Sequence, residues 1–246
     1  MHPILVLLRK DILHFRRDRG TVIMTFLVPL TMIYLFGQIY GVHGPSPMAT
    51  QLVGGWAMQF LLFALVWSAN SLFQEKELGL FQRILSGPVP RSAILASKFL
   101  YGTGLGLLQL GILFVAGHFL FGIELLSHLP QLVLVGVGAA AACSAFGMLL
   151  ASLANNAEMA RGLYTFCILL MSALGGAWFP VSYMPPFMQQ WSRLTLVYWA
   201  IHGFQAVFAS STRWTGLLPT VGILFGLAAG LLAIAWWRFD RSTIFA

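Results

Sequence analysis

Six apolar stretches, each about 20 residues long, constrain this chain more than any other feature of its sequence. A helix of about that length crosses the roughly 30 Å hydrocarbon core of a bilayer, and none of the six contains an acidic residue, a lysine or an arginine. Only 9% of all residues are charged, against about 25% in ordinary soluble domains. We therefore expect an all-α membrane protein with six transmembrane helices. The predicted spans are Thr21–Tyr40, Gln51–Phe73, Phe99–Phe121, Gln131–Leu153, Gly162–Phe179 and Leu217–Trp237.

The lysines and arginines orient these spans. If the N-terminus is cytoplasmic, twelve of the fourteen basic residues lie inside and only Arg193 and Arg213 lie outside. Cytoplasmic loops carry such an excess, which explains the net charge of +7 without nucleic acid as a partner. We predict a single transmembrane domain over residues 1–246, in the cell inner membrane, with both termini in the cytoplasm. The inside residues are Arg9, Lys10, Arg16, Arg17, Arg19, Lys76, Arg83, Arg91, Lys98, Arg161, Arg238 and Arg241.

The first 20 residues have the pattern of an amphipathic helix. A basic amphipathic helix before a span is typical of an in-plane helix at the membrane interface. The simpler interpretation is an anchor for the first span, and the sharper one is a helix that also clasps a partner. At helical spacing Leu5, Leu8, Ile12 and Phe15 form an apolar stripe, while Lys10, His14, Arg17 and Asp18 lie on the other side.

The outer segment of residues 180–216 is rich in aromatic residues. Aromatic side chains at this density favour the membrane–water interface. We expect short re-entrant helices in the outer leaflet between spans five and six, and the alternative is an ordinary aromatic belt at the ends of those spans. The aromatic residues are Tyr183, Phe187, Trp191, Tyr198, Trp199, Phe204, Phe208 and Trp214.

Residues 74–98 form a cytoplasmic loop with its own helical pattern. A helix from Gln74 would be stopped by Gly87 and Pro88. Such a helix can dock in the groove of a soluble partner, or it can simply link two spans. On one face it carries Glu77, Leu80, Phe81 and Ile84, and on the opposite face Glu75, Gly79, Gln82 and Arg83.

This loop and several later motifs resemble the type-two ABC exporter permease family, and the likeness in layout covers the whole chain. The chain has Leu80 where the family often has Thr or Ser, and it lacks a proline that the family often has near Leu196. The motifs are Glu75-Lys76-Glu77-Leu78-Gly79, Gln82-Arg83-Ile84-Leu85, Pro88-Val89-Pro90-Arg91 and Lys98. Farther on they are Asn155-Asn156-Ala157-Glu158-Met159-Ala160, Gly175-Gly176, Phe179-Pro180, Met184-Pro185-Pro186, Ser192-Arg193-Leu194 and Tyr198-Trp199-Ala200.

The resemblance implies that two such permeases, as a homodimer or a related heterodimer, bind two copies of a separate ABC ATPase. The segment Gln74–Gly87 would then be the coupling helix, and the N-terminal helix would brace the same contact. The implied coupling residues are Glu75, Glu77, Gly79, Leu80, Phe81, Arg83 and Ile84. The implied interface-helix residues are Leu8, Lys10, Ile12, His14, Phe15 and Arg17.

The chain contains no phosphate-binding loop of the pattern G-x-x-x-x-G-K-[ST]. It is therefore not expected to be an enzyme or to bind a cofactor, and ATP and Mg would bind to the partner ATPase. Because the six histidines have no ligand spacing, we expect no metal site. The absence of charges inside the spans argues against a proton-driven carrier. Gln59 and Gln109 either face a translocation route or form hydrogen bonds between helices.

Small residues recur at four-residue spacing in spans three and six. Glycines at this spacing let helix backbones approach closely in lipid. Packing within one subunit is the favoured role, and a dimer seam is the alternative. The glycines are Gly102 and Gly106, then Gly222, Gly226 and Gly230.

Taken together, these features favour an exporter permease that moves an amphipathic substrate (a drug, a lipid or a lipid-linked glycan) across the inner membrane. The first alternative is a polysaccharide export permease, because an aromatic-lined groove suits a glycan. The second is a membrane structural or assembly factor that keeps the docking helix but has no transport role. A stand-alone channel or secondary carrier is disfavoured by the uncharged spans.

Overall fold

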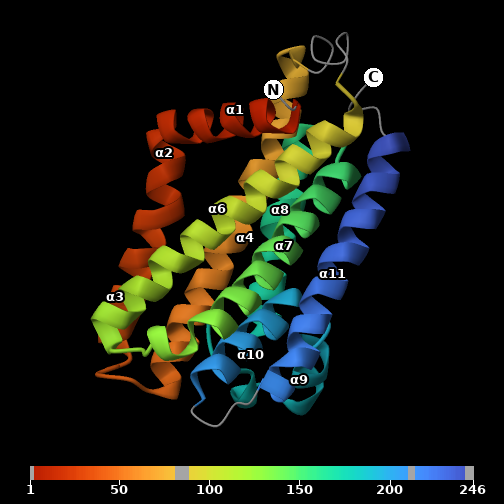
Figure 1. Cartoon of the computed structure of the whole chain (residues 1–246). Coiled ribbons are helices and arrows are strands. Elements are labelled where there is room, and N and C mark those ends of the chain that lie inside the picture. Colours follow the sequence, from red (N-terminus) through yellow and green to blue (C-terminus); the bar gives the residue numbers. More distant parts are fainter. Residues whose placement is uncertain (1–2, 81–88, 210–213, 242–246) are drawn as a thin grey trace.

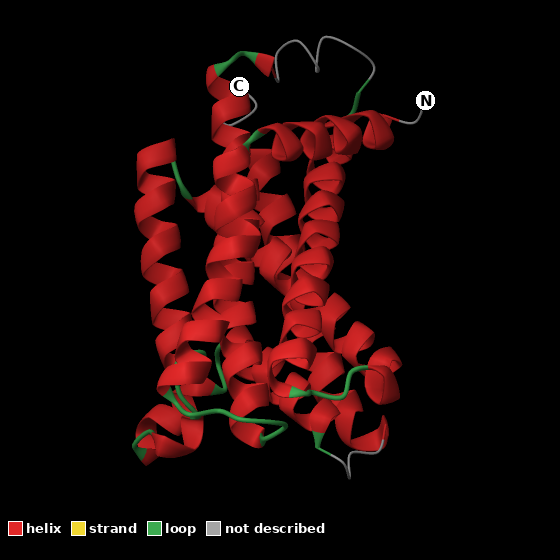
Figure 2. Ribbon diagram, turned by 90° about the vertical axis from the view of Figure 1, so that its left-hand side faces the viewer, coloured by secondary structure: helices red, strands yellow, loops and turns green. Residues whose placement is uncertain are grey.

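The computed structural model describes residues 3–80, 89–209 and 214–241, and these residues form helices joined by short loops, with no strand among them (Figures 1 and 2). Six helical segments are long and apolar enough to cross a membrane, which confirms the predicted fold class. The long elements are α1 (Pro3–Arg17), α3 (Val28–Ile39), α4 (Pro47–Glu77), α6 (Arg91–Phe121), α7 (Leu129–Leu153), α8 (Ala157–Gly175), α10 (Leu196–Phe208) and α11 (Trp214–Arg241). The short ones are α2 (Arg19–Val22), a π-helical turn (Ile23–Leu27), α9 (Pro186–Ser192) and the 3-10 turns Leu126–His128 and Val181–Tyr183.

Helices α4 and α7 form the centre of the bundle. In their membrane-length windows 78% and 72% of the residues are buried, against 22% in the first span, 22% in α8 and 28% in α11. Small residues of α7, including the run Ala139–Ala142, let its neighbours approach closely. A Cβ on Gly102 would lie 2.5 Å from Oγ of Ser144, and one on Gly106 would lie 2.8 Å from Leu61. The first glycine pair therefore packs α6 against α7 and α4, as predicted.

The glycines of α11 do not pack against other helices of this subunit as expected. Added Cβ atoms at Gly222, Gly226 and Gly230 would meet no atom within 4 Å. Packing within this subunit, the favoured interpretation, is therefore wrong for these three positions. The physical reason is that α11 contacts α7 through its other face, where Leu224 lies against Gly138.

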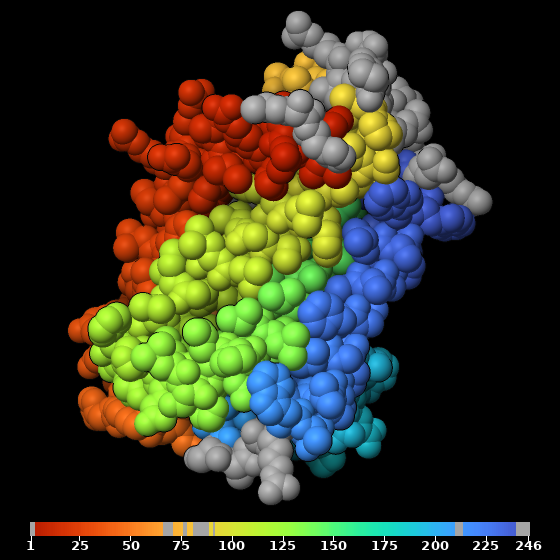
Figure 3. Space-filling view, viewed as in Figure 1, coloured from red at the N-terminus to blue at the C-terminus, as the bar shows by residue number. Residues whose placement is uncertain are grey.

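The first residues of α1 and the last residues of α11 lie at the same end of the bundle, as six crossings require (Figure 1). We call this the α1 end, and the opposite end, where α9 and α10 lie, the α10 end. Helix α1 runs across the bundle at the α1 end and packs against the start of α6 (Figure 3). The chain then turns at Asp18, whose carboxylate accepts hydrogen bonds from the backbone N–H and the hydroxyl of Thr21. This is an N-cap that starts the first span.

Several helix ends differ from the predicted spans. Helix α4 continues past Phe73 to Glu77, and α6 begins at Arg91 instead of Phe99. The predicted helix from Gln74 to Gly87 is interrupted, because Gly79 has a φ of +65°, a left-handed conformation that ends a right-handed helix. Residues 81–88 of that prediction lie outside the described part of the chain. Helix α8 ends at Gly175, four residues before the predicted end, because Gly176 has a φ of +86°.

The segment between α8 and α11 contains the helices α9 and α10, neither of which is among the six membrane-length segments. Its first residues pack tightly on α4, since a Cβ on Gly55 would overlap the carbonyl oxygen of Ala177. Gln51 of α4 donates to the carbonyl of Gly176 and accepts from Gln205 of α10. These bonds fasten α10 and the end of α8 to α4. Whether α9 and α10 re-enter a membrane leaflet stays a prediction.

Candidate functional site: a buried ion-pair cluster and the cavity beside it

Four charged side chains from three helices meet at the α1 end. Lys98 Nζ of α6 lies 2.9 Å from Asp11 Oδ1 of α1 and 2.6 Å from Glu75 Oε1 of α4. Lys10 Nζ lies 2.6 Å from the same Glu75 oxygen and 3.3 Å from Asp11 Oδ1. Lys98 also donates to the hydroxyl of Ser71 at 2.9 Å. An ammonium group has three N–H donors, and each of the three acceptors around Lys98 comes from a different position on α1 or α4.

The cluster is largely sealed from solvent. The side chains of Lys98, Asp11 and Glu75 are 3%, 6% and 12% exposed, while Lys10 is 35% exposed at the rim. Two lysines and two carboxylates compensate each other, so no net charge is buried. Removing one partner from a buried pair typically costs about 3–5 kcal/mol, because the other charge is left uncompensated.

The electrostatics of Glu75 follow from this geometry. Burial alone would raise its pKa, but the attraction to Lys98 and the hydrogen bonds from Lys10 and Lys98 outweigh burial. The pKa of Glu75 therefore lies below its usual value, and the side chain is a carboxylate at neutral pH. The charged form is what holds α4 to α1 and α6.

The cluster lies at the base of the connection between α4 and α6. Glu75 precedes the last residue of α4 by two positions, and Lys98 lies near the beginning of α6. Lys98 and Lys10 each lie within 3.3 Å of both carboxylates, so the cluster holds three helices together at this point.

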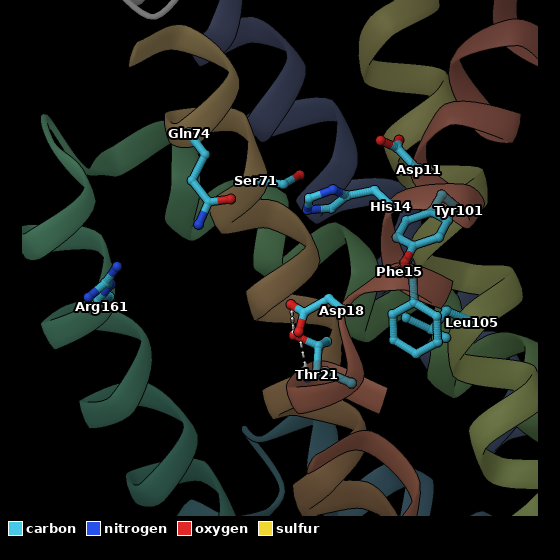
Figure 4. A pocket seen from close by; sticks show the side chains of 11 residues that line it. Asp11, His14, Phe15, Asp18, Thr21, Ser71, Gln74, Tyr101, Leu105 and Arg161 are labelled. Carbon is cyan, nitrogen blue, oxygen red and sulfur yellow. Dashed lines mark hydrogen bonds between the residues drawn. The ribbon is translucent and has the colours of Figure 1, made fainter. Parts of the chain in front are cut away.

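A cavity of about 440 Å³ adjoins the cluster (Figure 4). Its back wall is α4, with Ala64, Ser71 and Gln74, and its other walls come from the α1–α2 corner, from α6 and from α8. Asp18 faces it as a carboxylate, because the hydrogen bonds from Thr21 lower the pKa of this acid. Arg161 of α8 lies across the cavity from the α1–α2 corner in Figure 4.

The predicted residues of the N-terminal helix divide among three places. Lys10 joins the cluster, and His14 and Phe15 line the cavity. Leu8 is half-buried, whereas Ile12 and Arg17 are exposed. The apolar stripe thus lies largely outside the bundle core, with Leu5 60% and Ile12 43% exposed. A place for this stripe at the membrane interface stays a prediction.

The predicted coupling residues are only partly described. Glu75 is engaged inside the protein, Gly79 forms the turn after α4, and Leu80 is half-buried. Glu77 ends α4. Phe81, Arg83 and Ile84 lie outside the described residues, so the contact of this set with an ATPase stays a prediction.

The two glutamines considered for a translocation route both form hydrogen bonds between elements. Gln59 accepts a hydrogen bond from the indole N–H of Trp178. Gln109, which is fully buried, donates to the carbonyl oxygen of Thr25 at 2.9 Å. That carbonyl lies four residues before Pro29, which has no N–H for the usual helical bond. Gln109 supplies a donor there, within the π-helical turn.

Sequence reasoning missed Asp11 and Ser71, and it used Lys98 only to orient the spans and as part of a motif. One signal was available, because Asp11 is the single acidic residue of the otherwise basic helix α1. A lone acid on the buried side of a basic helix indicates a buried cationic partner. Its partner is Lys98, 87 residues away in sequence.

Comparison with known proteins identifies the family. A profile of the family described as ABC-2 type transporter matches residues 2–209. The chain belongs to the ABC-2 type transporter family. The inner membrane transport permease YadH of Escherichia coli K12 is 26% identical over 238 residues, which cover 94% of this chain and 92% of YadH.

A second relative is the linearmycin resistance permease protein LnrN of Bacillus subtilis. It is 26% identical over 175 residues, which cover 71% of this chain. The matched part spans 45% of the length of LnrN. Both relatives are named as permeases, in keeping with the six apolar helices of this ABC-2 family member.

Proposed function

We propose that this chain is the transmembrane permease subunit of an ATP-binding-cassette exporter, with the α1 end in the cytoplasm. The observation that carries the proposal is the buried cluster of Lys10, Asp11, Glu75 and Lys98. It joins the interface helix to both helices that flank the connection between α4 and α6. In a protein that receives its energy from outside the membrane, such a cluster transmits a displacement of that connection to two spans, α4 and α6.

The proposed partners are two copies of an ABC ATPase and a second permease. ATP and Mg bind to the ATPase, and closure of its dimer moves the coupling segment Gln74–Gly87 together with α1. The cluster then shifts the ends of α4 and α6 as one unit. Exposed apolar residues on the first span and α8, including Leu27, Phe166 and Leu170, suit contact with lipid or with the second permease.

The proposed cargo is an amphipathic molecule that leaves toward the outer leaflet past α9 and α10. Two features support this class. The cavity of Figure 4 combines charged side chains with apolar ones, and one relative is named as a resistance permease for linearmycin.

The test is reconstitution. The chain is co-expressed with candidate ABC ATPases from the same genome, and the purified complex is placed in liposomes. One ATPase should co-purify, and its hydrolysis should drive movement of an amphipathic fluorescent substrate in one direction. If no ATPase co-purifies, or if movement is the same without ATP, the proposal is wrong.

A further inference from the structure

Helix α1 carries an unbalanced charge on its exposed surface. Its one acidic residue, Asp11, is buried and bonded to Lys98. Asp18, at the turn into α2, is the one exposed acid of residues 3–20, and it faces the cavity of Figure 4. Basic side chains therefore dominate the solvent side of this helix, and an anionic partner suits it. The exposed arginines of residues 3–20 are Arg9, Arg16, Arg17 and Arg19.

Two of these arginines alternate with two apolar residues along one face of α1. Residues at successive intervals of four, three and four positions share one stripe of a helix. All four side chains are exposed, Leu5 by 60% and Ile12 by 43%. Neither arginine has an ion-pair partner among the side chains that the structure describes. We call these four residues the arginine stripe, and they are Leu5, Arg9, Ile12 and Arg16.

The arginine stripe faces away from the bundle. Lys10 and Asp11 both bond into the ion-pair cluster, and a helix turns by about 100° per residue. The centre of the stripe therefore lies roughly 130° around α1 from each of these two residues. Helix α1 runs across the end of the bundle, whereas the spans run along it (Figures 1 and 2). In a membrane, a helix that lies crosswise at the end of the spans turns its outward side to the bilayer surface.

From these observations we infer that the arginine stripe binds the anionic surface of the leaflet at the α1 end, through phospholipids with a net negative head group such as phosphatidylglycerol. Leu5 and Ile12 enter the border of the acyl chains. The guanidinium groups of Arg9 and Arg16 reach back to the phosphates, to which they can donate paired hydrogen bonds. An acidic protein groove would match the arginines but would not need the exposed apolar residues between them. The contact goes beyond the proposed function, because it requires no ATPase.

The test follows amide hydrogen exchange of α1 in the purified permease. One set of nanodiscs contains phosphatidylcholine alone, and the other contains phosphatidylcholine and phosphatidylglycerol in equal parts. Each basic residue near an anionic surface corresponds to about a fivefold gain in binding. Exchange of the α1 amides should therefore be about tenfold slower or more with phosphatidylglycerol, while the buried part of α4 exchanges equally in both. Added salt should reduce the difference, because it screens the charges. Equal exchange of α1 in the two kinds of disc would overturn the inference.

A double variant tests the two arginines. Arg9→Gln combined with Arg16→Gln should remove most of the difference between the two kinds of disc, because both charges that face the lipid are lost. The matched control is Arg238→Gln, an exposed arginine near the end of α11, at the same end of the bundle. It should keep the full difference. A difference that survives in the double variant, or an equal loss in the control, contradicts the inference.

A second pair of variants tests which face of α1 meets the bilayer. Ile12 belongs to the arginine stripe and its neighbour Leu13 does not, although their exposures are nearly equal at 43% and 41%. Ile12→Gln should speed exchange of α1 by about fivefold or more in both kinds of disc, since an apolar side chain leaves the lipid. Leu13→Gln should change it less. An equal or larger effect of Leu13→Gln would contradict the placement of the stripe.

Binding of the same arginines by a protein partner gives a different result. The double variant would then keep the lipid-dependent difference in nanodiscs and lose co-purification of the ATPase, and this outcome overturns the inference while leaving the proposed function intact. If the lipid-dependent difference is found and depends on both arginines, but no ATPase couples, the inference holds and the proposed function is wrong.

Discussion

The ammonium of Lys98 lies 2.6 Å from Oε1 of Glu75 and joins the beginning of α6 to the end of α4. The two residues flank the connection that the family resemblance assigns to ATPase contact. Because Lys98 also binds Asp11 of α1, the pair is the centre of a joint among three helices.

The first prediction concerns Lys98→Met. The change leaves two buried carboxylates with only the half-exposed Lys10, so the free energy of unfolding should fall by about 3–5 kcal/mol. Chemical unfolding in mixed micelles measures it. Arg193→Gln, an exposed basic residue at the α10 end, is the matched control and should change stability by less than about 0.5 kcal/mol. If both changes lower the free energy of unfolding equally, the cluster does not stabilise the fold.

The second prediction concerns acid. The pKa of Glu75 is lowered in the folded protein from its ordinary value of 4.5, so its ion pairs stabilise the fold above that value. This stabilisation is lost as the pH falls through the lower, folded-state pKa. Glu75→Gln should be less stable than the wild type at pH 7, and the difference should vanish in acid. Melting temperatures from pH 7 to pH 3 check this, and a constant difference would refute it.

The third prediction concerns Gln109 and Pro29. Gln109→Leu removes a donor from the buried carbonyl of Thr25, and it should destabilise the protein by about 1–3 kcal/mol. Pro29→Ala restores a backbone N–H four residues after Thr25. The cost of Gln109→Leu should therefore be smaller in a Pro29→Ala background. A double-mutant cycle of unfolding free energies measures the coupling, and strict additivity would contradict the role assigned to Gln109.

The fourth prediction compares two glycines. Gly55→Ala places a Cβ onto the carbonyl oxygen of Ala177, and this overpacking should cost about 1–3 kcal/mol. Gly222→Ala meets open space in α11 and should be neutral or stabilising by up to about 1 kcal/mol, because alanine favours a helix interior. Thermal melting in detergent ranks the two variants, and the reverse order would contradict the packing described for α4.

The spans could be predicted because each is a local property of about 20 residues. The cluster could not, since its members are brought together by helix packing; Asp11 and Lys98 are 87 residues apart. The predicted helix from Gln74 is interrupted at Gly79, because an apolar pattern does not reveal the positive φ of this glycine. For the same reason the glycine pattern alone did not distinguish Gly106, which packs inside the bundle, from Gly226, which does not.

In the proposed function, the cluster transmits motion between an ATPase and the spans. The most direct measurement is the number of substrate molecules transported per ATP hydrolysed by the reconstituted complex. Lys10→Met removes the most exposed member of the cluster, so the fold should tolerate it. We predict that this ratio falls about fivefold or more in Lys10→Met and Lys98→Met while the ATPase stays bound, and that Arg193→Gln matches the wild type. A wild-type ratio in folded complexes of both cluster variants would contradict the claim.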